Sequence, residues 1–156
     1  MNRTIFILPF SFLLLGMISC QPSPRCTDRT DVYINIGFYT LKNGIETDTL
    51  LTRPVIYGIG REDSVLTSGI SSLDKIGLPP APGQTSCLFV LNYGGQSDTL
   101  SFSYTPDLQF LSFECGFIEF YTDMEFTTTN HLIDSSAVTQ PLVSNNDEEN
   151  IRLYIF

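Results

Sequence analysis

The chain has 156 residues, a formal net charge of −9, and 12% aromatic residues without a single tryptophan. Seventeen acidic residues against eight basic ones argue against nucleic acid or anionic lipid head groups as partners. The length fits one domain that builds its own core.

The first nineteen residues have the order of a secretory signal peptide. Arg3 supplies a positive charge, residues 5–18 (IFILPFSFLLLGMI) are an apolar run, and the small residue Ser19 precedes Cys20. The run is shorter than the roughly 20 residues that a transmembrane helix needs. We therefore expect residues 1–19 to be removed.

The run Met17-Ile18-Ser19-Cys20 resembles a bacterial lipobox, in which the cysteine thiol receives diacylglycerol and becomes the first residue of the mature chain. The family pattern prefers leucine where Met17 stands, and the alternative is an ordinary signal peptide that contains a cysteine. The resemblance implies lipidation of Cys20, with palmitate-type acyl chains that hold the protein on the membrane. Residues 20–25 then form a short tether, and residues 26–156 a single domain.

From Asp31 onward, apolar and polar residues alternate with the period of a half-buried strand. Eight segments with this character are predicted to be strands: residues 32–39, 54–60, 64–68, 86–93, 98–104, 109–122, 131–138 and 150–156. Turn signals separate them, including 42–44, 79–83, 94–95, 105–107 and 145–147. Seven or eight short strands predict an all-β fold, a single β-sandwich, with an immunoglobulin-like Greek key favoured.

One predicted strand changes parity along its length. Leu111, Phe113 and Cys115 alternate inward, whereas Ile118 and Phe120 continue on the other parity. A slip of one residue is typical of a β-bulge, which a glycine such as Gly116 accommodates. We therefore expect one bulged strand over residues 109–122, with Cys115 facing the core.

Besides Cys20, the chain has three cysteines: Cys26, Cys87 and Cys115. Secreted chains normally oxidise their cysteines, and an odd number leaves one unpaired. We favour a disulfide between Cys26 and Cys115, which would tie the start of the domain to a late strand, with Cys87 as the alternative partner.

Several short motifs match a known pattern in order and spacing: Gly37-Phe38-Tyr39, Gly58-Ile59-Gly60 with Asp63-Ser64, Leu78-Pro79, Leu100 to Tyr104, and Glu114-Cys115-Gly116-Phe117. Together they resemble an uncharacterised family of small lipoproteins from Bacteroidetes, a domain of unknown function. The resemblance implies a β-sandwich lipoprotein without an assigned activity.

The same resemblance bears on location and modification. Surface lipoproteins of that phylum tend to carry acidic residues directly after the lipidated cysteine, and residues 21–25 have none. The periplasmic side of the outer membrane is therefore favoured over the cell surface. The phylum's glycan-attachment pattern, Asp-Ser/Thr before an apolar residue, implies O-glycosylation at Thr49, Ser64 and Thr99; ordinary turn chemistry is the alternative reading.

No catalytic residue is predicted. A serine or cysteine nucleophile needs a base, and the one histidine, His131, is interpreted as a surface or strand-end residue because no nucleophile-elbow pattern occurs. Cys87 and Cys115 would act only if reduced. Glu114 and Glu119 are candidates for a glycosidase pair, but both are expected to be exposed on one sheet.

Metal and partner sites are weakly indicated. Asp147, Glu148 and Glu149 form the one calcium candidate, with a solvated turn as the favoured alternative, so no metal site and no cofactor are predicted. Aromatic residues opposite the apolar stripes (Tyr33, Tyr39, Tyr154 and Phe156) indicate a binding surface or, as favoured, local packing.

Together these observations predict a non-enzymatic envelope lipoprotein, anchored to the membrane by its lipid, whose sandwich binds an envelope protein or polymer. A carbohydrate- or calcium-binding module is the alternative.

Overall fold

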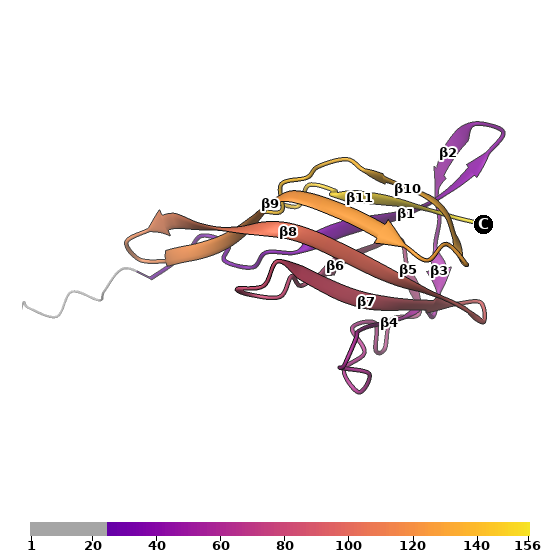
Figure 1. The fold of residues 1–156 in the computed structure, drawn as a ribbon, viewed down its shortest axis with the longest axis horizontal. Helices are drawn as coiled ribbons and strands as arrows, with labels where there is room; N and C mark the ends of the chain where they lie inside the picture. The colour runs from indigo at the N-terminus through magenta and orange to yellow at the C-terminus, as the bar shows by residue number, and fades with distance from the viewer. Residues whose placement is uncertain (1–24) are drawn as a thin grey trace, which may run out of the picture.

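The computed structural model describes residues 25–156, and their regular structure is entirely β (Figure 1). The expected signal peptide, Cys20 and all of the tether except Arg25 lie outside this described part. The strands are β1 (Ile34–Lys42), β2 (Ile45–Asp48), β3 (Leu51–Thr52), β4 (Val55–Gly58), β5 (Ser72–Leu73), β6 (Lys75–Leu78), β7 (Ser86–Tyr93), β8 (Gln96–Ser112), β9 (Gly116–Thr128), β10 (Ile133–Val138) and β11 (Ile151–Ile155). Within residues 25–156, no helix is long and apolar enough to span a membrane.

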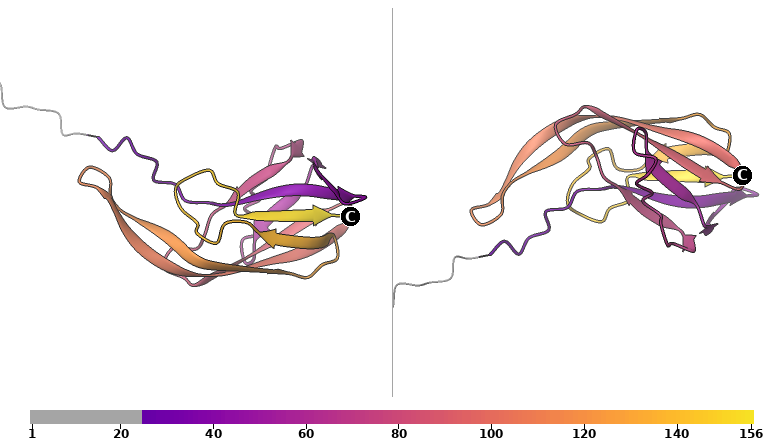
Figure 2. Two further views of the ribbon diagram at one scale, coloured as in Figure 1. Left: turned by 90° about the horizontal axis from the view of Figure 1, so that it is seen from above. Right: turned by 90° about the horizontal axis from the view of Figure 1, so that it is seen from below.

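The strands form two main sheets that pack face to face (Figure 2). One sheet has the order β10-β11-β1-β2, with β6 also pairing with β1, and the other has the order β4-β7-β8-β9; β3 and β5 form a small separate ladder. β1 and β11 are parallel, with Ile36 opposite Ile151. The predicted all-β sandwich is confirmed.

The core lies between the two sheets, and the predicted apolar stripes supply it. Ile34, Ile36 and Phe38 of β1 are buried, as are alternate residues of β11. The opposite sheet contributes Phe89, Leu91, Leu100, Phe102, Tyr104, Tyr121 and Met124. Each fully buried aliphatic or phenyl side chain stabilises the fold by about 1.5–3 kcal/mol relative to an exposed one, so these stripes provide the main drive for sheet packing.

The prediction of one bulged strand over residues 109–122 is wrong. β8 ends at Ser112 and β9 begins at Gly116, so the chain reverses direction there. Gly116 has a φ of 74°, in the left-handed region that glycine adopts at little cost. The change of parity therefore marks a hairpin turn, and Cys115 lies at the tip of that hairpin rather than facing the core.

The turn predicted at residues 105–107 is also wrong, because these residues lie inside β8. Pro106 is opposite Tyr121 of β9. β7 reaches only as far as Ser86, opposite Ser103, so among the described strands β9 alone pairs with β8 at Pro106. A proline, which has no N–H to donate, is tolerated where one side of a strand lacks a neighbour.

Residues 64–68, predicted as a strand, form turns instead. The hydroxyl of Thr67 donates to the carbonyl of Pro54 at 2.7 Å and accepts from the N–H of Ile56 at 3.1 Å. The N–H of Leu66 donates to the carbonyl of Ile56 at 2.8 Å. The hydroxyl of Thr67 thus takes the place of backbone groups along the edge of β4, and the segment lies beside β4 without forming a strand.

Candidate functional site

A cleft of about 570 Å³ lies beside β4 and β7. Its walls come from the loop after β4, from the proline-rich loop Pro79–Pro82, and from residues 87–89 of β7. Ile59, Leu66 and Leu88 line it and are partly exposed, and Arg61 contributes a cation. The arrangement offers an apolar, open surface with one charged group at its wall.

Cys87 lies in this cleft and is the free cysteine among the described residues. Burial raises the pKa of its thiol, although hydrogen bonds with Tyr104 and the backbone of Ala81 act in the opposite direction. The hydroxyl of Tyr104 in turn accepts a hydrogen bond from the N–H of Ala81 at 2.9 Å. A thiol with a raised pKa is mostly protonated at neutral pH, so the cleft presents a weak nucleophile.

His131 is held by the carboxylate of Asp98 rather than beside a nucleophile. Oδ1 of Asp98 lies 3.0 Å from Nδ1 of His131 and accepts from the hydroxyl of Thr129 at 2.7 Å. Thr129 Oγ1 is 3.3 Å from the same ring nitrogen. In a catalytic triad the acid and the nucleophile contact opposite ring nitrogens. Here the Asp98 carboxylate and the Thr129 hydroxyl both contact Nδ1, so these three side chains stabilise the β9–β10 connection.

Asp98 is fully buried, and every hydrogen bond to its carboxylate comes from this connection. The backbone N–H groups of His131, Leu132 and Ile133 donate to it at 2.7–2.8 Å. Burial raises the pKa of the carboxyl, but the hydrogen bonds outweigh it and lower the pKa from 3.8 to about 2. Asp98 therefore stays ionised and acts as a structural anchor.

The calcium candidates Asp147, Glu148 and Glu149 contact different partners, four side chains in all. Asp147 pairs with Arg29, and Glu148 accepts from the side-chain amide of Gln140 at 3.2 Å. Glu149 accepts from Tyr39 and Arg152. Among residues 25–156, no three acidic, histidine or cysteine side chains gather as metal ligands. The acidic turn thus fastens neighbouring segments.

The aromatic residues expected on the outer faces divide into two groups. Tyr39 is buried, donates to Glu149 at 2.7 Å, and packs 6.1 Å from Tyr154 between ring centroids. Arg152 stacks over the Tyr39 ring at 5.3 Å. Burial and the bond to Glu149 raise the pKa of Tyr39 to about 12. Tyr33 is half-buried and Phe156 is exposed, so the outer aromatics do not form one patch.

Glu114 and Glu119 do not face one another across a cleft. Glu114 is exposed in the β8–β9 turn. Glu119 accepts from the N–H of Gly83 and from the hydroxyl of Tyr121, both at 2.9 Å. These contacts fasten the proline-rich loop to β9 and leave neither residue arranged for acid–base work.

The three glycosylation candidates differ in exposure. Ser64 is exposed in the loop that lines the cleft. Thr49 is half-buried, and its hydroxyl donates to Oγ1 of Thr40 at 3.1 Å. Thr99 is half-buried within β8 and follows the buried Asp98. Ser64 is the most accessible of the three hydroxyls.

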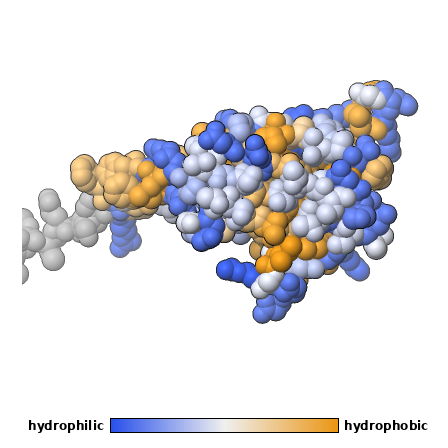
Figure 3. Space-filling view, viewed as in Figure 1, coloured by the Kyte–Doolittle hydropathy of each residue, from blue (hydrophilic) through white to orange (hydrophobic). Residues whose placement is uncertain are grey.

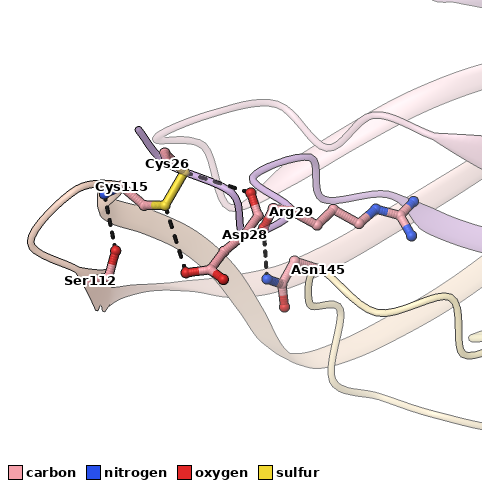
Figure 4. The surroundings of a disulfide bond; sticks show 6 residues. All are labelled: Cys26, Asp28, Arg29, Ser112, Cys115 and Asn145. Atoms are coloured by element: carbon pink, nitrogen blue, oxygen red, sulfur yellow. Dashed lines mark hydrogen bonds between the residues drawn. A yellow bond between two sulfur atoms is a disulfide. The ribbon is translucent and has the colours of Figure 1, made fainter. Parts of the chain in front are cut away.

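Cys26 and Cys115 form a disulfide, which is the pairing favoured from the sequence (Figure 4). The bond joins the start of the described chain to the tip of the β8–β9 hairpin, with Asp28 beside it. The side chain of Asn145 donates to the carbonyl of Arg29 at 2.8 Å and fixes the next turn of this segment.

Two features were not predicted from the sequence. The cleft is formed by loops that are far apart in the chain, and no local sequence pattern predicts that these loops lie side by side. The apolar hairpin tip, with Phe110, Phe113 and Phe117, was hidden by the interpretation of residues 109–122 as one strand. The glycine after Phe-Glu-Cys was the available signal, because it suits a turn as well as a bulge.

Comparison with curated proteins and with solved structures finds no match. A model of a family of unknown function, DUF6452, matches residues 54–155, from β4 to the end of β11. The match spans the whole sheet that carries the cleft, together with β10 and β11. Since it covers well over half of the chain, the chain belongs to the DUF6452 family.

Proposed function

We propose that this protein is a lipid-anchored component of a bacterial envelope, of the kind found in Bacteroidetes, that binds an envelope protein or polymer and catalyses no reaction. The anchor is Cys20, and the periplasmic side of the outer membrane is its expected location. The proposal for the anchor is supported by the apolar run 5–18 and by the Met17–Cys20 motif.

The observation that carries the binding role is the cleft beside β7. The cleft is lined together by Leu88 of β7, which is 43% exposed, and by Ile59 and Leu66 of the loop after β4. Contiguous apolar side chains at a recess are characteristic of recognition surfaces. The segment Pro79–Pro82 forms a wall with few N–H groups and restricted φ angles, so this wall loses little conformational freedom when a partner binds.

We propose that the protein is not an enzyme because the side chains that could act as acids, bases or nucleophiles are bonded within the fold or, for the thiol, poorly ionised. Asp98 is bonded to the β9–β10 connection, and Glu119 is bonded to Gly83 and Tyr121. The thiol of Cys87 has a raised pKa. O-glycosylation at Thr49, Ser64 or Thr99 would add sugar to the surface, and intact-mass analysis of the native protein tests it directly.

The binding role is tested by crosslinking and pull-down from intact cells with the full-length protein and two matched variants. Leu88→Lys places a charge in the cleft, and Leu142→Lys places the same charge on a residue outside it. The two leucines are 43% and 40% exposed. We expect one envelope partner to be enriched with the wild type and Leu142→Lys, and to be lost with Leu88→Lys.

Equal enrichment by both variants would show that the cleft does not bind the partner. If glycan or Ca²⁺ shifts the melting temperature while no protein is enriched, the protein is a ligand-binding module instead. A Cys20→Ala variant that still sediments with membranes would overturn the lipid anchor.

A further inference from the structure

The tip of the β8–β9 hairpin carries the most exposed aromatic surface among the described residues. Phe113 is 94% exposed, Phe117 is 65% exposed, and Leu108 and Phe110 are more than half exposed. The ring of Phe110 lies 5.4 Å from the rings of both Phe113 and Phe117. Figure 3 shows the apolar colour gathered at this end of the molecule. We refer to these four residues as the apolar tip.

The apolar tip is not part of the core. From Asp107, opposite Phe120, to the turn, the described parts of β8 and β9 pair with each other and extend as a two-stranded ribbon past the end of the sandwich (Figures 1 and 2). Phe110 is directly opposite Phe117 in this ribbon. An exposed cluster of phenyl groups is unfavourable in water and marks an interaction surface when it persists.

The disulfide fixes the apolar tip beside the chain that leads to the proposed anchor. Cys115 is two residues from Phe113, and its Cα lies 4.7 Å from that of Cys26. Cys26 is six residues after Cys20, and six extended residues span at most about 20 Å. Cys26 is thus within roughly 20 Å of the lipid, and Phe113 lies two residues from the cysteine bonded to it, if Cys20 is acylated as proposed above.

We propose that the apolar tip inserts into the interface of the same membrane leaflet that holds the lipid on Cys20. Phenyl and leucine side chains bury themselves at the boundary between head groups and acyl chains. Around the tip, the exposed acidic residues Asp28 and Glu114 outnumber the exposed Arg25 next to Cys26, so attraction to anionic lipid does not drive the contact. The partner that we propose for the apolar tip is therefore a zwitterionic lipid surface, which the tip binds through apolar contacts. A second copy of the chain is the competing occupant.

Insertion gives the domain two points of attachment, the acyl chains and the apolar tip. Attachment at Cys20 alone would let the sandwich change its orientation, whereas two points of attachment restrict the direction of its long axis relative to the membrane. The C-terminal end and Phe156 lie at the opposite end of the molecule from the apolar tip (Figure 1). They are held away from the bilayer in this orientation.

The chain has no tryptophan, so a single introduced tryptophan reports on one place. Phe113→Trp labels the apolar tip, and Phe156→Trp is the matched control, because Phe156 is 78% exposed at the far end. The full-length, lipidated proteins are purified and reconstituted in phosphatidylcholine vesicles with and without bromine-labelled acyl chains, which quench tryptophan on contact.

We expect blue-shifted emission and strong quenching for Phe113→Trp, and aqueous, unquenched emission for Phe156→Trp. In the Phe113→Trp protein, a further Phe117→Ser substitution is expected to reduce the inserted fraction relative to the free fraction by about tenfold. Unquenched, aqueous emission of Phe113→Trp on vesicle-bound protein would overturn the insertion and leave the anchor intact.

Blue-shifted emission without quenching would place the tip against a second copy and also overturn insertion. Quenching of both tryptophans would mean that the domain lies flat, which contradicts the orientation. Protein without acyl mass on Cys20 that fails to associate with vesicles would instead refute the proposed lipid anchor. Mass spectrometry of the N-terminal peptide separates that failure from the others.

Discussion

Asp98 and His131 are joined by a hydrogen bond of 2.7 Å from the backbone N–H of His131 to Oδ1 of Asp98, across 33 residues of chain. The same oxygen lies 3.0 Å from the imidazole ring. Through this contact, the one histidine of the chain helps to hold the connection between β9 and β10. Asp98 is the buried carboxylate that accepts the hydrogen bonds of this connection.

Replacement of Asp98 by asparagine should destabilise the domain by about 3 kcal/mol, because backbone N–H groups that now bond to a buried carboxylate would lose a charged acceptor. Urea denaturation of wild type and Asp98→Asn at pH 7 measures this difference. Asp134→Asn, at an exposed position, is the control. Equal midpoints for the two variants would show that the buried carboxylate contributes nothing.

The same carboxyl makes stability depend on acid pH. Its pKa is lowered from 3.8 to about 2 in the folded protein, so the unfolded chain binds the proton first as the pH falls. The stabilisation is complete above about pH 4 and is lost as the pH falls toward 2, by on the order of 2 kcal/mol. Urea midpoints across this range should fall more steeply for wild type than for Asp98→Asn. Parallel curves would exclude Asp98 as the titrating group.

Loss of the disulfide should be costly because it closes a long loop. Cys26 and Cys115 are separated by 89 residues, for which the chain-entropy account gives a stabilisation of about 4–5 kcal/mol. Cys115→Ser and reduction of the wild type are expected to lower the free energy of unfolding equally. Cys87→Ser, at the free and half-buried cysteine, should change it by less than about 1 kcal/mol. A larger loss for Cys87→Ser would mean that the pairing in solution differs.

Truncation of a core side chain in the last strand tests the packing of β11. Leu153 is fully buried opposite Phe38, and Leu153→Ala should cost about 2–5 kcal/mol. Leu142→Ala makes the same change at a partly exposed position outside the strands and should cost less than 1 kcal/mol, by roughly the scale of surface substitutions. Thermal denaturation followed by circular dichroism compares the two. A small loss for both would indicate that β11 does not close the core.

Gly37 leaves room for Glu149 on the outer face of β1. A Cβ atom at position 37 would lie 2.2 Å from Oε2 of Glu149 and 2.7 Å from the ring of Tyr39. Glu149 would have to move and give up its bonds to Tyr39 and Arg152, so Gly37→Ala should cost about 1–3 kcal/mol. Gly58→Ala is the control, because the nearest atom to its Cβ is at 3.8 Å. Similar stability of both variants would disprove this account.

The sequence predicted the elements whose side chains alternate over a whole strand. Ile34, Ile36 and Phe38, like Ile151 and Leu153, are buried as their period requires. Because one face of such a strand is buried, its register is fixed, and the alternation in the sequence therefore predicts both the strand and its buried face. The short strand β2 gave no such signal, since its four residues are all exposed and it forms as the second arm of a hairpin on β1.

The candidate surfaces were harder to predict because each depends on contacts between distant segments. The hydrogen bonds of Thr67 hold the loop after β4 along the edge of β4, and Ile59 and Leu66 of this loop line the cleft. A single threonine in the sequence does not predict this role. At Gly116, a bulge and a turn require similar backbone freedom, and only the pairing of Phe110 with Phe117 distinguishes them. Local alternation contains no information about which long-range pairing is chosen.

The parallel pairing of β1 with β11 has a consequence for the order of folding. β11 lies between β1 and β10, so the centre of that sheet remains open until Ile151 to Ile155 have been synthesised. Contacts between the first and the last strand close a loop almost as long as the domain, which slows folding. The complete core, which includes Ile151, Leu153 and Ile155, therefore cannot form before β11 has been synthesised.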